Sequence, residues 1–133
     1  MYPIRIFVSH AWGHNAHYYR LLNLLNQRGY FRYYDHSVPE HDPFEWTNSA
    51  KVAALLKEQI RTAQVVLVVA GVHASYRDWM QKELRMARSL NKPIIGVRPR
   101  GAERTSTVAE TYADEVVNWN ADSIVNAIRR WVR

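Results

Sequence analysis

The sequence predicts an α/β protein with one doubly wound, five-stranded parallel sheet in the order 2-1-3-4-5. Short apolar runs without alternation, such as Val65–Ala70, are typical of strands buried on both faces. Between these runs, apolar residues recur at helical spacing, as at Met80, Leu84 and Ala87. Because strands and helices alternate along the chain and crossovers between parallel strands are right-handed, helices should cover both faces of the sheet.

Five stretches rich in β-branched and aromatic residues are the predicted strands. They are Ile4–Val8, Tyr30–Tyr34, Val65–Ala70, Ile94–Val97 and Glu115–Asn118. A loop, Ser9–Gly13, follows the first strand. A longer one, Asp35–Trp46, follows the second and holds two prolines without periodicity. Such a long loop in a small domain is often functional.

Helices are predicted where capping residues precede apolar residues spaced three and four apart. They run from Asn15 to Gly29, from Asn48 to Thr62, around Trp79–Ala87, from a capping box at Thr107 and Glu110, and onward from a cap at Asn120. The apolar face of the second holds Val52, Leu56, Ile60 and Ala63, and that of the last holds Ile124, Ile128 and Trp131.

Length and composition favour a single cytosolic domain over residues 1–133. The absence of cysteine excludes disulfides, thiolate catalysis and cysteine-based zinc sites. No apolar run has the length of a membrane span, and the N-terminus lacks a signal-peptide pattern, so no membrane contact is expected. The net charge of +6 suits an anionic ligand. The arginines are scattered over loop and tail, so a solvated surface is favoured over nucleic-acid binding.

The predicted topology brings several chemically useful side chains to one place. The switch point of this strand order lies between the first and third strands, so the loop Ser9–Gly13 should face the segment Gly71–Glu83. The candidate pocket residues are Ser9, His10, Trp12, Trp46, Trp79 and Glu83. Trp79 and Glu83 lie four apart and share a helix face that differs from the apolar stripe. On spacing alone, a functional role for this pair and an ordinary structural role, with Glu83 exposed on the helix and Trp79 in the core, are about equally favoured.

Several other site types do not fit. Phosphoacceptor receiver domains need acidic residues after the first and third strands, where this chain has Ser9-His10 and Ala70-Gly71. No glycine-rich dinucleotide motif and no nucleophile elbow is present. Three histidines, His10, His14 and His17, are spaced so that their side chains could converge on a metal ion. No carboxylate is close to them in sequence, so no metal site is predicted.

The motifs resemble those of TIR domains. Phe7-Val8-Ser9-His10 resembles the opening motif of that superfamily, and Ser75, Trp79 and Glu83-Leu84 are similar to its tryptophan-x-x-x-glutamate helix. The segment Tyr34–Pro43 resembles the corresponding loop of bacterial TIR-like proteins from Thoeris anti-phage systems, as does Val117–Asn120. This loop is not the usual TIR loop, so assembly contacts of animal and plant TIR domains are not transferred.

The resemblance implies a flavodoxin-like fold and cleavage of the nicotinamide–ribose bond of NAD, which is the substrate, with no cofactor. Glycoside hydrolysis normally uses two carboxylates, but nicotinamide leaves as a neutral base and needs no acid. Glu83 is the expected catalytic carboxylate, which offsets oxocarbenium charge. The implied substrate-binding residues are Ser9, His10, Trp12, Asp35, Trp46, Ser75 and Trp79.

For Thoeris-like proteins the implied product is a cyclic ADP-ribose isomer that activates a partner effector. The loop Asp35–Trp46 is a natural gate, so activity is expected to need a trigger or self-association. Two alternatives stay open. One is a TIR-type interaction module without catalysis, and the other is a sensor that binds ADP-ribose-like nucleotides.

Overall fold

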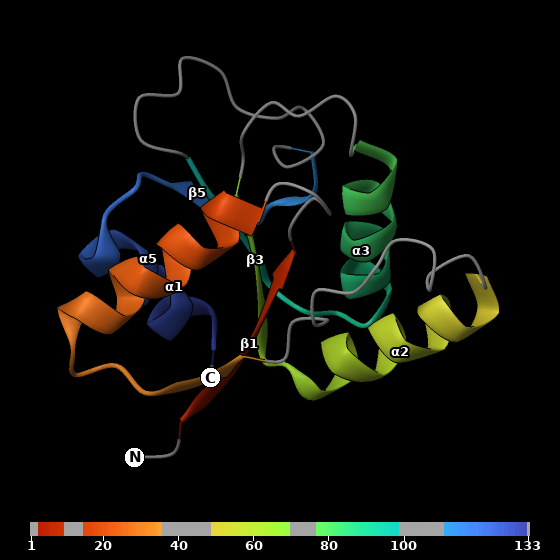
Figure 1. Cartoon of the computed structure of the whole chain (residues 1–133), viewed down its shortest axis with the longest axis horizontal. Coiled ribbons are helices and arrows are strands. Elements are labelled where there is room, and N and C mark those ends of the chain that lie inside the picture. Colours follow the sequence, from red (N-terminus) through yellow and green to blue (C-terminus); the bar gives the residue numbers. More distant parts are fainter. Residues whose placement is uncertain (1–2, 10–14, 36–48, 70–76, 99–110, 133) are drawn as a thin grey trace.

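The five strands form one parallel sheet in the order β2-β1-β3-β4-β5, as the sequence predicts (Figure 1). The computed structural model describes residues 3–9, 15–35, 49–69, 77–98 and 111–132, with side chains except at 15–18, 49–53 and 77–80. The strands are β1 Ile4–Ser9, β2 Tyr33–Asp35, β3 Val65–Val69, β4 Ile94–Val97 and β5 Glu115–Val117.

Three strands have bounds that differ from the prediction, and of these β5 ends at Val117 rather than Asn118. Ser9 belongs to β1 and pairs with Val68 of β3, so it is not a loop residue. β2 begins at Tyr33 rather than Tyr30 and includes Asp35. The reason is the turn after α1, where Gly29 and Tyr30 both have positive φ, 71° and 56°. That left-handed conformation is incompatible with a strand, and the Tyr30 side chain is 97% exposed.

The described helices are α1 Asn15–Arg28, α2 Ser49–Thr62, α3 Arg77–Ser89 and α5 Ala121–Trp131, and Thr111 and Tyr112 are also helical. The predicted cap of the last helix is confirmed, because the Asn120 side chain accepts a hydrogen bond from the Ser123 amide at 3.0 Å. The capping box at Thr107 and Glu110 lies outside the described residues.

The helices form one layer on each face of the sheet (Figure 1). One core lies between the sheet and α1 with α5, and includes Ile6 and Val8 of β1. The other lies between the sheet and α2 with α3, and includes Phe7 of β1. Since side chains alternate along a strand, Ser9 lies on the same face as Phe7, toward α2 and α3.

Trp131 is less buried than the other residues of its predicted apolar helix face. Ile124 and Ile128 of the same helix face are completely buried, but Trp131 is 41% exposed. Its indole nitrogen donates a hydrogen bond to Oε1 of Glu115 at 2.9 Å. The last turn of α5 therefore lies beside the start of the edge strand β5 instead of over the sheet.

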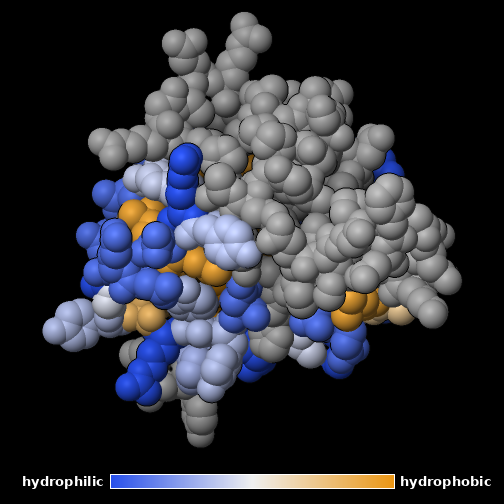
Figure 2. Space-filling model, viewed as in Figure 1, coloured by the Kyte–Doolittle hydropathy of each residue, from blue (hydrophilic) through white to orange (hydrophobic). Residues whose placement is uncertain are grey.

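The surface of the described residues is mainly hydrophilic, with small apolar patches, on the face that Figure 2 shows. Such scattered patches are ordinary for a protein in water. Among the described helices, none combines the length and apolar character that a membrane span requires.

Candidate active site

Ser9 and Glu83 meet in the interior of the protein. The Ser9 hydroxyl donates a hydrogen bond to Oε1 of Glu83, with 2.9 Å between the oxygen atoms. Ser9 is 1% exposed and Glu83 3% exposed. In the described part of the chain, these are the only fully buried side chains with polar groups. Buried polar groups are costly unless they are bonded, so this pair is a candidate for function.

The packing of α3 on the sheet explains why Glu83 is buried. Leu84 and Ala87 of this helix belong to the core beneath α2 and α3, together with Val68 of the neighbouring strand. Glu83 precedes Ala87 by one turn, about 40° away around the helix axis. The buried face of α3 is therefore wider than the predicted apolar stripe and includes Glu83. This result excludes the interpretation of Glu83 as an exposed helix glutamate.

Burial controls the protonation of Glu83. Desolvation raises the pKa of the Glu83 carboxyl to about 8, and the hydrogen bond from Ser9 opposes this rise only in part. The unliganded protein therefore holds Glu83 mainly as a neutral acid at pH 7. A carboxylate that offsets positive charge must first lose this proton.

The pair also lies where open α/β sheets bind ligands. Ser9 is the last residue of β1, at the carboxyl end of the strand that separates β2 from β3. In doubly wound sheets, the crevice outside the carboxyl ends at the switch point is the usual ligand site. The topology predicted from sequence brings Ser9 and Glu83 together here, although they are 74 residues apart.

The other predicted site residues are placed less fully. His10, Trp12, Trp46 and Ser75 lie outside the described residues. Trp79 belongs to α3, one turn before Glu83, but its side chain is not described. Asp35 ends β2 and is exposed, and its Cα pairs with that of Ile6. This register places Asp35 about 10 Å before Ser9 along the sheet.

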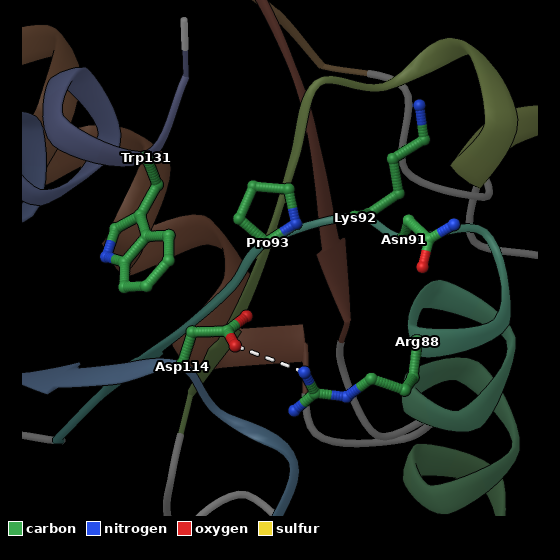
Figure 3. Close-up of a pocket in the computed structure, with 6 residues that line it drawn as sticks. All are labelled: Arg88, Asn91, Lys92, Pro93, Asp114 and Trp131. Carbon is green, nitrogen blue, oxygen red and sulfur yellow. Dashed lines mark hydrogen bonds and ion pairs between the residues drawn. The ribbon is translucent and has the colours of Figure 1, made fainter.

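A concave region, which the sequence does not predict, lies at the amino ends of β4 and β5, whereas Ser9 is at the carboxyl end of β1 (Figure 3). It has a volume of about 340 Å³ and is lined by Arg88, Asn91, Lys92, Pro93, Asp114 and Trp131. Figure 3 shows the Arg88 guanidinium directed at Asp114, whose Oδ1 is 3.1 Å from Nη1. Oδ2 of Asp114 accepts a hydrogen bond from the Ile94 amide at 2.8 Å. These bonds join α3 to the starts of β4 and β5, so we assign Arg88 and Asp114 a structural role.

No curated protein matches this sequence. Among solved structures, the fold is similar to that of the CMP N-glycosidase BcmB of Clostridium botulinum. The two are 13% identical with a TM-score of 0.51, over 94% of this chain and 98% of the other. A 3-dehydroquinate dehydratase-like protein of Bifidobacterium longum is 10% identical with a TM-score of 0.50, over 99% and 96%. These likenesses show the fold.

The sequence itself matches a protein family that is described as "Thoeris protein ThsB, TIR-like domain". The match covers residues 7–104, which include β1, α3 and the contact between Ser9 and Glu83. It agrees with the resemblance carried by the motifs within this range, namely Phe7–His10, Tyr34–Pro43 and the helix motif with Trp79 and Glu83. The chain therefore belongs to the family of TIR-like domains of the Thoeris protein ThsB.

Proposed function

We propose that this protein cleaves the nicotinamide–ribose bond of NAD in a Thoeris-type anti-phage system and makes a nucleotide signal for an effector protein. The observation that carries this proposal is the buried Glu83, held by Ser9 at the switch point of the sheet. The family supplies the biological setting. N-glycosidic chemistry is compatible with the fold, because one protein of similar structure is named a CMP N-glycosidase.

The proposed reaction places a simple demand on the protein. When the bond between the ribose C1′ and the nicotinamide nitrogen breaks, its electron pair stays on nitrogen and nicotinamide leaves as a neutral molecule. Positive charge then develops on the ribose, and an ionised Glu83 would stabilise it. Oε1 of Glu83 is held by Ser9, and Oε2 has no hydrogen-bond partner among the described residues. Oε2 is therefore the oxygen that we assign to the ribose.

The product depends on which nucleophile reaches C1′. Water gives ADP-ribose, whereas a hydroxyl or the adenine of the same molecule gives a cyclic isomer. Aromatic walls that exclude water and fold the ligand back favour cyclisation. The aromatic side chains proposed for this task are those of Trp12, Trp46 and Trp79. We therefore expect an activated preparation to make mainly a product one water lighter than ADP-ribose, which mass spectrometry distinguishes.

Glu83→Gln tests the proposed role directly. The amide keeps the shape of the side chain but cannot carry negative charge, so nicotinamide release should fall by about 10²-fold or more. Glu58→Gln is the matched control, because Glu58 is exposed on α2 and its side chain bonds only Arg61 among the described residues. Chromatography measures nicotinamide, and circular dichroism confirms the fold of both variants. Equal activity of Glu83→Gln and the parent would assign the chemistry to another group.

A nucleotide sensor is the second candidate. It is compatible with the same buried pair, because burial raises the pKa of Glu83, and a neutral carboxyl group can hold a nucleotide without taking part in a reaction. The test uses protein that is both concentrated and self-associated. If it binds NAD or ADP-ribose without turnover, that result would support the sensor and contradict the enzyme.

A further inference from the structure

Glu83 is a buried carboxyl group without a cationic partner in the described structure. Among the described elements, α2, β1 and β4 make the most extensive contacts with α3, and β3 shares a core with it through Val66 and Val68. The charged side chains described on these elements and on α3 are exposed, and only burial and Ser9 shift the ionisation of Glu83. Those side chains are Lys57, Glu58, Arg61, Arg5, Lys82, Arg85 and Arg88. Arg85, which follows Glu83 by two residues along α3, donates instead to the Tyr112 hydroxyl at 3.0 Å.

A buried acid without a counter-ion is suited to a ligand that brings its own positive charge. We infer that this site selects ligands with a cationic ring, and that Glu83 releases its proton to solvent when such a ring binds. The inference rests on the proposed function, in which the ring is the pyridinium of oxidised NAD. The reduced form, NADH, has the same phosphates and riboses but a neutral nicotinamide ring. The site should therefore discriminate between the two forms by charge.

The proton balance of this step is simple. The neutral carboxylic acid and the cationic ligand become a carboxylate–cation pair, and one proton passes to solvent without any bond of the ligand breaking. The substrate thus creates the carboxylate that the cleavage step uses. After nicotinamide and the product leave, Glu83 is again a buried group without a counter-ion among the described residues and takes a proton back.

The affinity should then depend on pH in a defined direction. Burial raises the pKa of free Glu83 to about 8, and a bound cation must lower it. Below about pH 8, binding requires loss of the proton, so affinity for the cation should weaken by about tenfold for each unit of decreasing pH. Above this value the affinity should be constant. At pH 7, binding should release about 0.9 proton for each ligand.

Calorimetry on the full chain can count these protons. The probe is a carbocyclic analogue of NAD, in which a methylene group replaces the oxygen of the nicotinamide ribose, so that the pyridinium is kept but the bond is not cleaved. Titration at pH 7 in two buffers of different ionisation enthalpy gives the protons released. The same titration is made with NADH, with Glu83→Gln and with the control Glu58→Gln.

We expect release of nearly one proton with the analogue at pH 7, none at pH 9.5, and none with NADH. Glu83→Gln should release none and bind equally at both pH values, and Glu58→Gln should behave as the parent. Absence of proton release at pH 7, equal pH dependence for NADH, or failure to bind the analogue would each overturn the inference. Nicotinamide release together with pH-independent binding would overturn the inference but not the proposed function. If the analogue releases a proton on binding but no preparation of the protein cleaves NAD, the inference stands and the proposed function is overturned.

Discussion

Replacing Glu83 with glutamine should stabilise the protein, and increasingly so as the pH rises. The neutral amide has the size of the neutral acid and can accept the hydrogen bond from the Ser9 hydroxyl through its carbonyl oxygen. Unlike the acid, it never has to ionise in the interior. The free energies of unfolding of the parent protein and the variant should therefore differ mainly by the free energy that is needed to keep Glu83 protonated in the folded protein.

The size of this effect follows from the shift in pKa. The pKa of Glu83 rises from 4.5 to about 8, and each unit is worth 1.36 kcal/mol, which gives about 5 kcal/mol in all. Because the folded-state pKa is the higher one, the stability of the parent is fully present below pH 4.5. It is lost as the pH rises through about 8. Relative to low pH, the loss is about 1 kcal/mol at pH 5, about 3 at pH 7 and about 5 at pH 9.

Urea denaturation of both proteins at these three pH values measures the difference in free energy of unfolding. Subtracting the free energy of unfolding of one protein from that of the other at each pH removes the contribution of every titratable group that the two proteins share. Glu115→Gln is a control of opposite sign. Hydrogen bonds from Trp131 and then Arg130 lower the pKa of Glu115, so that variant should lose stability at neutral pH and regain parity at acidic pH.

The refuting result is a difference between parent and Glu83→Gln that stays constant within about 1 kcal/mol from pH 5 to pH 9. A constant difference would mean that Glu83 ionises freely in the folded protein. The inference about cationic ligands would then lose its basis as well, because the site would not need a counter-charge.

Three further predictions address the neighbours of the site and its control. Ser9→Ala removes the hydroxyl that lowers the pKa of Glu83, so this pKa should rise further by about one unit, which NMR of the carboxyl carbon measures. The control Ser9→Thr keeps a hydroxyl and should leave the pKa of Glu83 unchanged. An unchanged pKa in Ser9→Ala would contradict the contact. Asp114→Ala removes the acceptor of the Ile94 amide and of Arg88, and should lower the free energy of unfolding by about 1–3 kcal/mol. Asp122→Ala, which breaks an exposed pair with Arg28, should cost less than about 1 kcal/mol, and an equal cost for both would argue against the structural role of Asp114. Dilute, monomeric protein should release nicotinamide slowly, with a rate per chain that rises as the chains associate, and full turnover by a demonstrated monomer would exclude this control.

The sequence by itself was sufficient to predict the sheet and its order. The run Val65–Val69 is apolar at every position because both of its faces are covered, and this pattern identifies a central strand directly. Helical spacing, together with the Asn120 cap, identifies α5. Handedness of the crossovers then leaves one simple strand order. All these features depend on residues close together along the chain, or on rules that hold for every chain.

Features that depend on distant neighbours were decided by the tertiary structure. The spacing of α3 left Glu83 open as an exposed residue, since a helix pattern does not reveal how wide a face its neighbours cover. Trp131 has the correct helical spacing for the core, but α5 ends beside the edge strand and leaves the indole partly exposed. The contact between Ser9 and Glu83 exists only once the register of β1 against β3 and the packing of α3 are set. The raised pKa of Glu83 arises from removal of water by those elements, and therefore no local sequence pattern could contain it.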